Sequence, residues 1–128
     1  RHNVVEMNKL PIPFFSNKQF KLEVKYKQMR SDKFIKGKMR AYVGKRYAGF
    51  CDFVIYVPYE LKVIKIYLLP EFRKQGIGKF MIDFLKMIAS KINVPIFLIS
   101  NKSAIDFYLK LGFRFDGHPR NRRMIWIP

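Results

Sequence analysis

The sequence predicts an α/β fold with a mixed, mostly antiparallel twisted sheet and flanking helices. In the first half, aromatic and β-branched residues alternate with polar ones, which is the two-residue period of half-buried strands. In the second half, apolar residues recur every three or four positions, which is the period of amphipathic helices. The 128 residues, of which 49% are apolar, are expected to form a single domain, residues 1–128.

The first half is expected to form an antiparallel meander. A loop with two prolines is expected at residues 9–15, and the alternation FKLEVKY then favours a strand at 20–26. Turns at residues 44–46 and 58–59 separate the strands that follow. These strands are expected at residues 38–43, 47–57 and 61–69.

The second half is expected to alternate helices with short strands. Apolar residues recur at helical spacing from Ile77 to Ile92, so we predict an amphipathic helix at 78–91. Gly112 is expected to end a second helix in the left-handed conformation. The remaining elements are a buried strand at 95–100, that second helix at 102–111, and closing strands at 113–115 and 124–127.

The formal net charge of +17 narrows the classes of partner. Small domains usually lie within several charges of neutrality, so this excess indicates attraction to polyanions. Nucleic acid, an acidic protein or a phosphorylated cofactor is favoured over polyamines and basic peptides. Solubility alone is the alternative explanation.

Cysteine and histidine are too few for a disulfide or a metal cluster. Cys51 has no second cysteine to pair with, and His2 and His118 are the only histidines, so no metal is expected. The sequence contains no run of 18 apolar residues and no signal-peptide pattern, so no membrane association is expected. These features predict a soluble, cytoplasmic protein.

The segment RKQGIGK joins the last meander strand to the first helix. Gly76 and Gly78 allow the backbone to approach an anion at the helix N-terminus, and Arg73, Lys74 and Lys79 add positive charge. The spacing fits neither GxGxxG nor GxxxxGK[ST], so a different diphosphate is indicated. The alternative is a helix-start loop with solvated cations.

Two motifs together resemble one family. Arg73-x-x-Gly76-x-Gly78 resembles the acyl-coenzyme-A pyrophosphate loop of the GNAT superfamily of N-acetyltransferases. The later segment NKSAIDFYLKLGF is similar to the family pattern N-x-x-A-x-x-F-Y-x-x-x-G-F. It matches at Asn101, Ala104, Phe107, Tyr108, Gly112 and Phe113. The resemblance is specific from Tyr47 to Phe113.

The sequence before Lys38 differs from the pattern of the family. Relatives usually carry two helices there, which help to form the acceptor groove, and this chain shows no amphipathic pair of helices.

The resemblance implies a GNAT-like sheet in which two parallel strands, at 61–69 and 95–100, splay apart to hold acetyl-CoA as co-substrate. It also implies that backbone groups around Leu68 and Leu69 pair with the pantetheine and polarise the thioester carbonyl. The implied cofactor-binding residues are Leu68, Leu69, Arg73, Lys74, Gln75, Gly76, Ile77, Gly78, Lys79, Asn101 and Tyr108.

Tyr108 matches the family tyrosine that protonates the departing thiolate. Transfer from a phenol of ordinary pKa to a thiolate is uphill by about 1.5 units, or roughly 2 kcal/mol. The alternative for Tyr108 is a core tyrosine packed beside Phe107. Asn101 either contacts the pantetheine or caps the second helix.

Some relatives carry a glutamate on the strand before the pyrophosphate loop. In this sequence Glu60, at the start of that strand, is the candidate general base, acting directly or through water, and Glu71, at its end, is the other nearby carboxylate. A dedicated base is unnecessary if the positive site itself depresses the pKa of the amine acceptor.

The resemblance places the loop HPRNRR near the acceptor side, so Arg120, Arg122 and Arg123 are the candidate substrate-binding residues; a solvated hairpin loop is the alternative. The sequence thus predicts an N-acetyltransferase whose amine acceptor lies on or near a polyanion, such as nucleic acid, aminoacyl-tRNA or an acidic protein. The alternative function is a non-catalytic or DNA-modifying GNAT-fold protein that binds nucleic acid.

Overall fold

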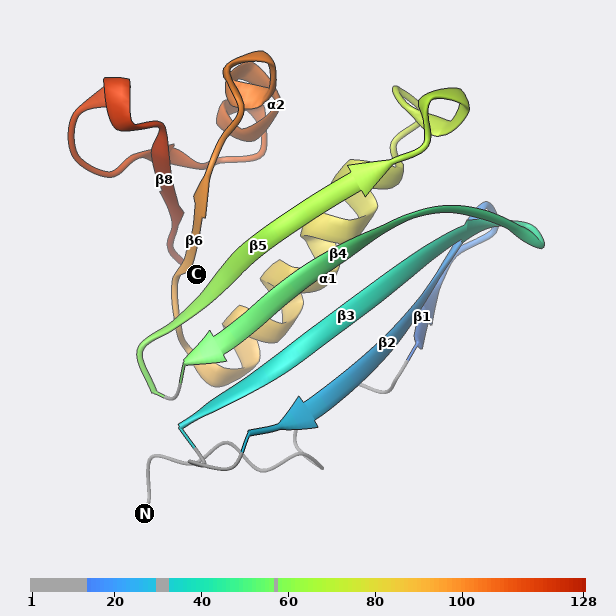
Figure 1. The fold of residues 1–128 in the computed structure, drawn as a ribbon, viewed down its shortest axis with the longest axis horizontal. Coiled ribbons are helices and arrows are strands. Elements are labelled where there is room, and N and C mark those ends of the chain that lie inside the picture. The colour runs from blue at the N-terminus through green and yellow to red at the C-terminus, as the bar shows by residue number, and fades with distance from the viewer. Residues whose placement is uncertain (1–13, 30–32, 57) are drawn as a thin grey trace.

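The computed structural model describes residues 14–29, 33–56 and 58–128. The described residues form an eight-stranded sheet with two helices, and Figure 1 shows α1 crossing behind β4 and β5. The strands are β1 (Phe14–Ser16), β2 (Phe20–Gln28), β3 (Phe34–Val43), β4 (Arg46–Tyr56), β5 (Glu60–Leu68), β6 (Ile96–Ile99), β7 (Arg114–Phe115) and β8 (Arg123–Trp126). The helices are α1 (Ile77–Ile92) and α2 (Ile105–Lys110). This arrangement confirms the predicted α/β class.

The strands follow the order β1-β2-β3-β4-β5-β6-β8-β7. Every neighbouring pair is antiparallel except β5 and β6, which are parallel. A parallel pair needs a crossover connection, and α1 provides it between β5 and β6. The sheet is therefore mixed and mostly antiparallel, as predicted.

The hydrophobic core lies between one face of the sheet and α1. Successive strand residues point to opposite faces, and the alternation of buried and exposed residues along β2 and β3 shows which face is covered. Leu22, Met39 and Cys51 are fully buried on this face, together with Met81 and Phe84 of α1. The helix is buried because its apolar stripe packs on this layer.

The observed elements differ from the predicted ones mainly in the first third. β3 begins at Phe34, four residues before the predicted strand, because Phe34 pairs with Tyr56 and the next residue pairs with Gln28. The last two residues of the predicted loop at 9–15 belong to β1, which pairs with β2. Residues 9–13, and the predicted end of β4 at residue 57, lie outside the described residues.

β5 and β6 pair over only a short segment and then diverge. They pair only at Leu61 with Ile96 and at Lys62 with Phe97, after which β6 pairs with β8 alone. A β-bulge at Ile64 interrupts the pairing of β5 with β4 and bends β5 just beyond the paired segment. Figure 1 shows the two strands separating toward their C-terminal ends, which confirms the splayed parallel pair.

Candidate functional site

The loop between β5 and α1 is built around two residues with positive φ. Lys74 has a φ of 62°, and Gly76, at the N-cap of α1, has a φ of 93°. A Cβ at position 76 would meet nothing closer than Phe20, at 3.8 Å, so it is the backbone conformation that requires glycine. The loop therefore brings exposed backbone to the start of the helix.

The N-terminus of α1 has no side-chain cap. The first bond of the helix runs from the Phe80 N–H to the Gly76 carbonyl at 3.0 Å, so the preceding N–H groups have no acceptor within the helix. Together with the helix dipole, these donors make the start of α1 chemically suited to an anion. Ile77 is fully buried, so only its backbone can take part.

The three loop cations have different roles. The Arg73 Nε donates to the Leu68 carbonyl at 2.9 Å, which ties the loop to the end of β5. Lys79 forms an ion pair with Asp83 at 2.8 Å, and Lys74 is exposed. Gln75 donates to the Glu71 carbonyl at 2.9 Å and closes the turn. Lys74 and the remaining N–H groups of Arg73 are thus the side-chain donors of this loop that an anion can reach most directly.

Gly78 brings the start of α1 close to α2 and to β5. A Cβ at this position would lie 3.2 Å from Phe107 of α2 and 3.8 Å from Leu68 of β5. The absence of a side chain at position 78 thus serves packing as well as access to the backbone. The loop, the end of β5 and α2 meet at this point.

Tyr108 is buried in α2, with 4% of its surface exposed. Its ring makes edge contacts with Phe107 and Phe113, at centroid distances of 5.0 and 5.6 Å. Burial raises the pKa of Tyr108 to about 12, with the Cys51 thiol as the smaller cause. Cys51 lies on β4 opposite Ile66 of β5, so the Tyr108 side chain approaches the sheet alongside the divergence.

Two backbone groups of Leu68 and Leu69 are already hydrogen-bonded within the protein. The Leu69 N–H donates to the Ala48 carbonyl at 2.8 Å, and the Leu68 carbonyl accepts from Arg73. Beyond Lys62, the backbone groups of β5 that point toward β6 have no partner in that strand. Residues 63–67 of β5 are therefore better placed than Leu69 to pair with an extended ligand.

Asn101 precedes the 3-10 turn Lys102–Ala104 that leads into α2. The Asn101 side chain makes no capping hydrogen bond, although it occupies the N-cap position and is exposed. Of the two roles predicted for Asn101, the structure does not show the cap.

Glu60 lies at the closed end of the divergence. It precedes the pair Leu61–Ile96, and six residues of strand place it about 20 Å from Ile66. The structure therefore does not bring Glu60 close to Tyr108. Glu71 is exposed in the 3-10 turn beyond the other end of β5.

The three arginines of the C-terminal segment have different environments. Arg123 pairs with Asp116 at 2.9 Å and stacks over Phe97. Arg122 has a φ of 55°, and its Nε is buried without a partner. Arg120 is exposed in the 3-10 turn Pro119–Asn121. Arg120 is thus the most accessible of the three, and Arg123 contributes to local structure.

Two features of the site were missed from the sequence. The bulge at Ile64 has a signal, because the inward-facing residues of β5 are spaced two, three and two apart at 61, 63, 66 and 68. The contact of Phe107 with Gly78 joins elements that are distant in the sequence, and it has no local signal.

In the part of the chain that the structure describes, no three His, Cys, Asp or Glu side chains are grouped to hold a metal ion. None of the helices in these residues is long and apolar enough to cross a membrane.

Comparisons with known proteins agree with this geometry. The family profile described as "Acetyltransferase (GNAT) domain" matches residues 37–115. The chain is 42% identical, over 41 residues, to the probable acyltransferase SID5 of Ajellomyces capsulatus, a match that covers 32% of this chain and 30% of that protein.

Two solved structures are similar in fold. PaiA N-acetyltransferase from Thermoplasma acidophilum, in complex with coenzyme A, has a TM-score of 0.58 and 22% identity, covering 69% of this chain and 57% of that one. The ribosomal-protein-S18-alanine N-acetyltransferase of Escherichia coli has a TM-score of 0.56 and 21% identity, covering 69% and 63%. The present chain thus matches less than two thirds of the length of each of these relatives.

Proposed function

Because the chain belongs to the GNAT family of acetyltransferases, we propose that it transfers an acetyl group from acetyl-CoA to an amine. The observation that carries the proposal is the divergence of β5 from β6, together with the uncapped N-terminus of α1 and the basic loop that follows β5. The proposal treats residues 1–128 as one acetyltransferase domain. The single buried thiol, Cys51, suits a reducing, cytoplasmic environment.

The loop would hold the pyrophosphate of acetyl-CoA. The backbone N–H groups of Gly76, Ile77, Gly78 and Lys79 would donate to it, with Arg73, Lys74 and Lys79 adding charge and Gln75 fixing the turn. The pantetheine would extend along β5 from Leu68 toward the bulge, with the exposed Asn101 beside it. Acetyl-CoA supplies the activated acetyl group as a thioester.

Tyr108 would protonate the leaving thiolate when the carbon–sulfur bond breaks and the new carbon–nitrogen bond forms. Its pKa of about 12 keeps the hydroxyl protonated at every physiological pH. The same shift makes transfer to a thiolate uphill by about 3.5 units, or roughly 5 kcal/mol, against about 2 for an ordinary phenol. N–H groups of β5 would stabilise the developing oxyanion.

The acceptor amine loses a proton during transfer, and the positive field of the protein favours its neutral form. A side-chain base is then not required, and water can accept the proton. Glu60 lies at the closed end of the divergence, so Glu60→Gln is expected to leave turnover within about twofold. A loss of a hundredfold or more would restore Glu60 as the base.

The acceptor is proposed to lie on or near a polyanion. The net charge of +17 raises the local concentration of nucleic acid or acidic protein, and the exposed Arg120 lies in the segment expected to face the acceptor. A non-catalytic or DNA-modifying nucleic-acid-binding role is the second candidate, favoured by the lysine-rich face of the sheet described below.

Calorimetric titration with acetyl-CoA, followed by an assay of thiol release with bulk tRNA as acceptor, tests the proposal. The expected result is saturable binding and thiol release that depends on the acceptor. Binding without thiol release for tRNA, acidic proteins and small amines would favour the second candidate. No saturable binding would remove the acetyltransferase proposal.

A further inference from the structure

The face of the sheet opposite α1 is rich in cations. We call it the outer face, and it consists of the alternate residues of β2–β5 that point away from the core. Eight cations lie on it against three carboxylates. The cations are Lys21, Lys25, Lys27, Lys36, Lys38, Arg40, Lys62 and Lys65, and the carboxylates are Glu23, Asp52 and Glu60. None of the described helices packs against this face.

Most of this charge is not neutralised locally. Lys38 pairs with Asp52 at 3.6 Å, and Lys21 pairs with Glu23 at 3.3 Å. The side chains of Lys25, Lys27 and Lys36 make no ion pair with any described residue. Like charges on neighbouring strands destabilise a sheet, so this arrangement points to an anionic partner.

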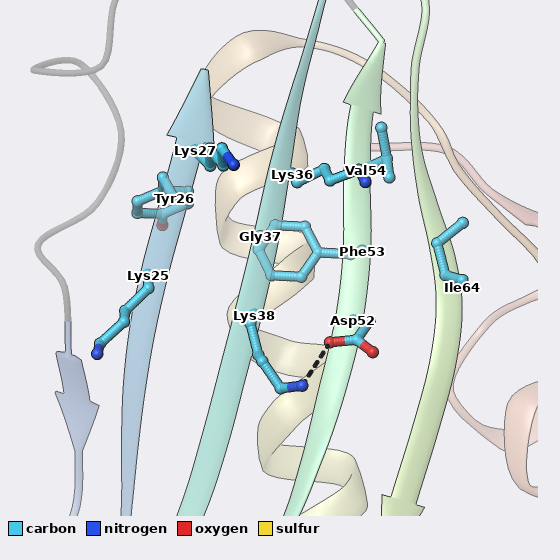
Figure 2. A pocket seen from close by; sticks show the side chains of 10 residues that line it. All are labelled: Lys25, Tyr26, Lys27, Lys36, Gly37, Lys38, Asp52, Phe53, Val54 and Ile64. Carbon is cyan, nitrogen blue, oxygen red and sulfur yellow. Dashed lines mark ion pairs between the residues drawn. The ribbon is translucent and has the colours of Figure 1, made fainter. Parts of the chain in front are cut away.

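The lysines surround a shallow depression of about 430 Å³. Figure 2 shows Lys25 and Lys27 on β2 and Lys36 and Lys38 on β3, with the Lys36 and Lys38 side chains extending toward β4 and Lys38 paired with Asp52. Gly37 also lines the depression, and a Cβ at this position would clash with the Phe53 ring, so β3 can carry no larger residue here. The depression is open to solvent and has the size and charge to receive phosphate groups.

Aromatic side chains lie on the same face, beside the lysines. Three cross-strand pairs are present, Tyr42 with Tyr47, Phe50 with Tyr67 and Phe34 with Tyr56, at centroid distances of 5.9, 6.2 and 5.7 Å. Tyr47, Tyr56 and Tyr67 are 37–40% exposed. Lys38 and Lys65 both approach the Phe50 ring, so aromatic and cationic groups alternate across the strands.

We propose that the outer face of β2–β5 binds a single-stranded nucleic acid, with phosphates over the lysines and bases against the exposed tyrosines. Cationic grooves with interleaved aromatics suit single strands, whose unpaired bases offer faces for stacking, whereas duplex bases are already stacked. An acidic polypeptide would neutralise the positive charge of the outer face, but it would offer no rings to stack on the aromatic pairs.

The binding does not depend on catalysis. If the bound nucleic acid also delivers the acceptor amine, that role rests on the proposed function. Lys62 and Lys65 lie on β5, the strand that diverges from β6, and so connect the outer face with the proposed acetyl-CoA site.

The test is fluorescence anisotropy with a labelled 12-nucleotide oligouridylate at several NaCl concentrations. The triple variant Lys25→Gln, Lys27→Gln, Lys36→Gln is expected to bind about tenfold or more weakly and to lower the salt slope by about 2. The control variant Lys18→Gln, Lys91→Gln, Lys110→Gln loses the same charge elsewhere and should stay within about twofold. If both variants lose the same affinity for the oligouridylate, a binding site at Lys25, Lys27 and Lys36 is contradicted.

Two further measurements separate the kinds of partner. Tyr47→Leu with Tyr56→Leu should weaken binding several-fold without changing the salt slope, because stacking is lost and charge is not. Polyglutamate that competes as well as the oligouridylate, or duplex RNA that binds more tightly, would overturn the proposal. If the protein binds the oligouridylate but not acetyl-CoA, the result would support nucleic-acid binding by the outer face and contradict only the proposed acetyltransferase activity.

Discussion

At the scale of single residues, Tyr108 is the side chain whose environment determines its chemistry. It packs among aromatic rings, as a core tyrosine would, yet its neighbour Phe107 lies against Gly78 at the start of α1. Burial keeps its proton in place and also makes that proton harder to transfer. The sequence predicted the position of this residue through its motif, but the raised pKa depends on burial against distant strands.

Tyr108→Phe is expected to lower kcat by about 10² to 10⁴ while leaving acetyl-CoA affinity within about twofold, because a general acid acts only in the transition state. In the unaltered protein, ionisation of Tyr108 should leave kcat unchanged near neutral pH and halve it only at a pH of about 12. Steady-state kinetics with calorimetry check both statements. Phe113→Leu, which alters the same aromatic cluster, is the control, and unchanged kcat in Tyr108→Phe would leave Tyr108 a core residue.

The same residue makes stability depend on alkaline pH. Because the pKa of Tyr108 is raised from 10.0 to about 12 by folding, its contribution is fully present below pH 10 and is lost as pH rises through 12. A shift of two units corresponds to about 3 kcal/mol. Urea unfolding at pH 8 and pH 11.5 should therefore show a smaller alkaline loss for Tyr108→Phe than for the unaltered protein. Equal losses would contradict the account.

At the scale of elements, local periodicity predicted most of the fold. The alternation in β2 and the helical spacing in α1 are signals within one segment, and both elements were found where they were predicted. The missed features arise between segments: β3 is lengthened by its partners, and β1 exists because it pairs with β2. The commitment of the Leu69 N–H to Ala48 likewise depends on a neighbouring strand.

Gly76→Ala should lower both acetyl-CoA affinity and stability. A φ of 93° costs an L-residue about 1–2 kcal/mol. If the backbone changes conformation to relieve this strain, the N–H groups at the start of α1 no longer point toward the proposed pyrophosphate position. Gly117→Ala is the matched control, because Gly117 has a φ of 90° with nothing within 4 Å of a Cβ. The control should lose stability alone. Equal acetyl-CoA affinity in the two variants, measured by calorimetry, would argue against a pyrophosphate site at the loop.

At the scale of the whole molecule, the two faces of the sheet have separate roles. One face packs with α1 into the core, and α1 begins at the proposed pyrophosphate site, while the other face carries an excess of cations. The sequence predicted the net charge and its attraction for polyanions. It could not predict that β2 and β3 would bring four lysines around one depression, since this depends on register.

Salt is therefore expected to act on acceptor binding and not on chemistry. For a nucleic-acid acceptor, KM should rise by at least tenfold between 50 and 200 mM NaCl while kcat changes by less than about twofold. A small amine without phosphate or carboxylate groups should show little change in KM over the same range. Initial-rate measurements with both acceptors check the prediction, and a flat KM for the nucleic acid would contradict a polyanionic acceptor.

The central claim is that the loop at the α1 N-terminus and the adjoining edge of β5 bind acetyl-CoA. Titration of the ¹⁵N-labelled protein with acetyl-CoA, followed in ¹H–¹⁵N correlation spectra, tests it most directly because it observes the donors themselves. The account predicts saturable shifts that are largest at the amides of Gly76, Ile77, Gly78 and Lys79 and at residues 63–67 of β5. Shifts confined to the outer face of β2 and β3, or no saturable shifts, would contradict it.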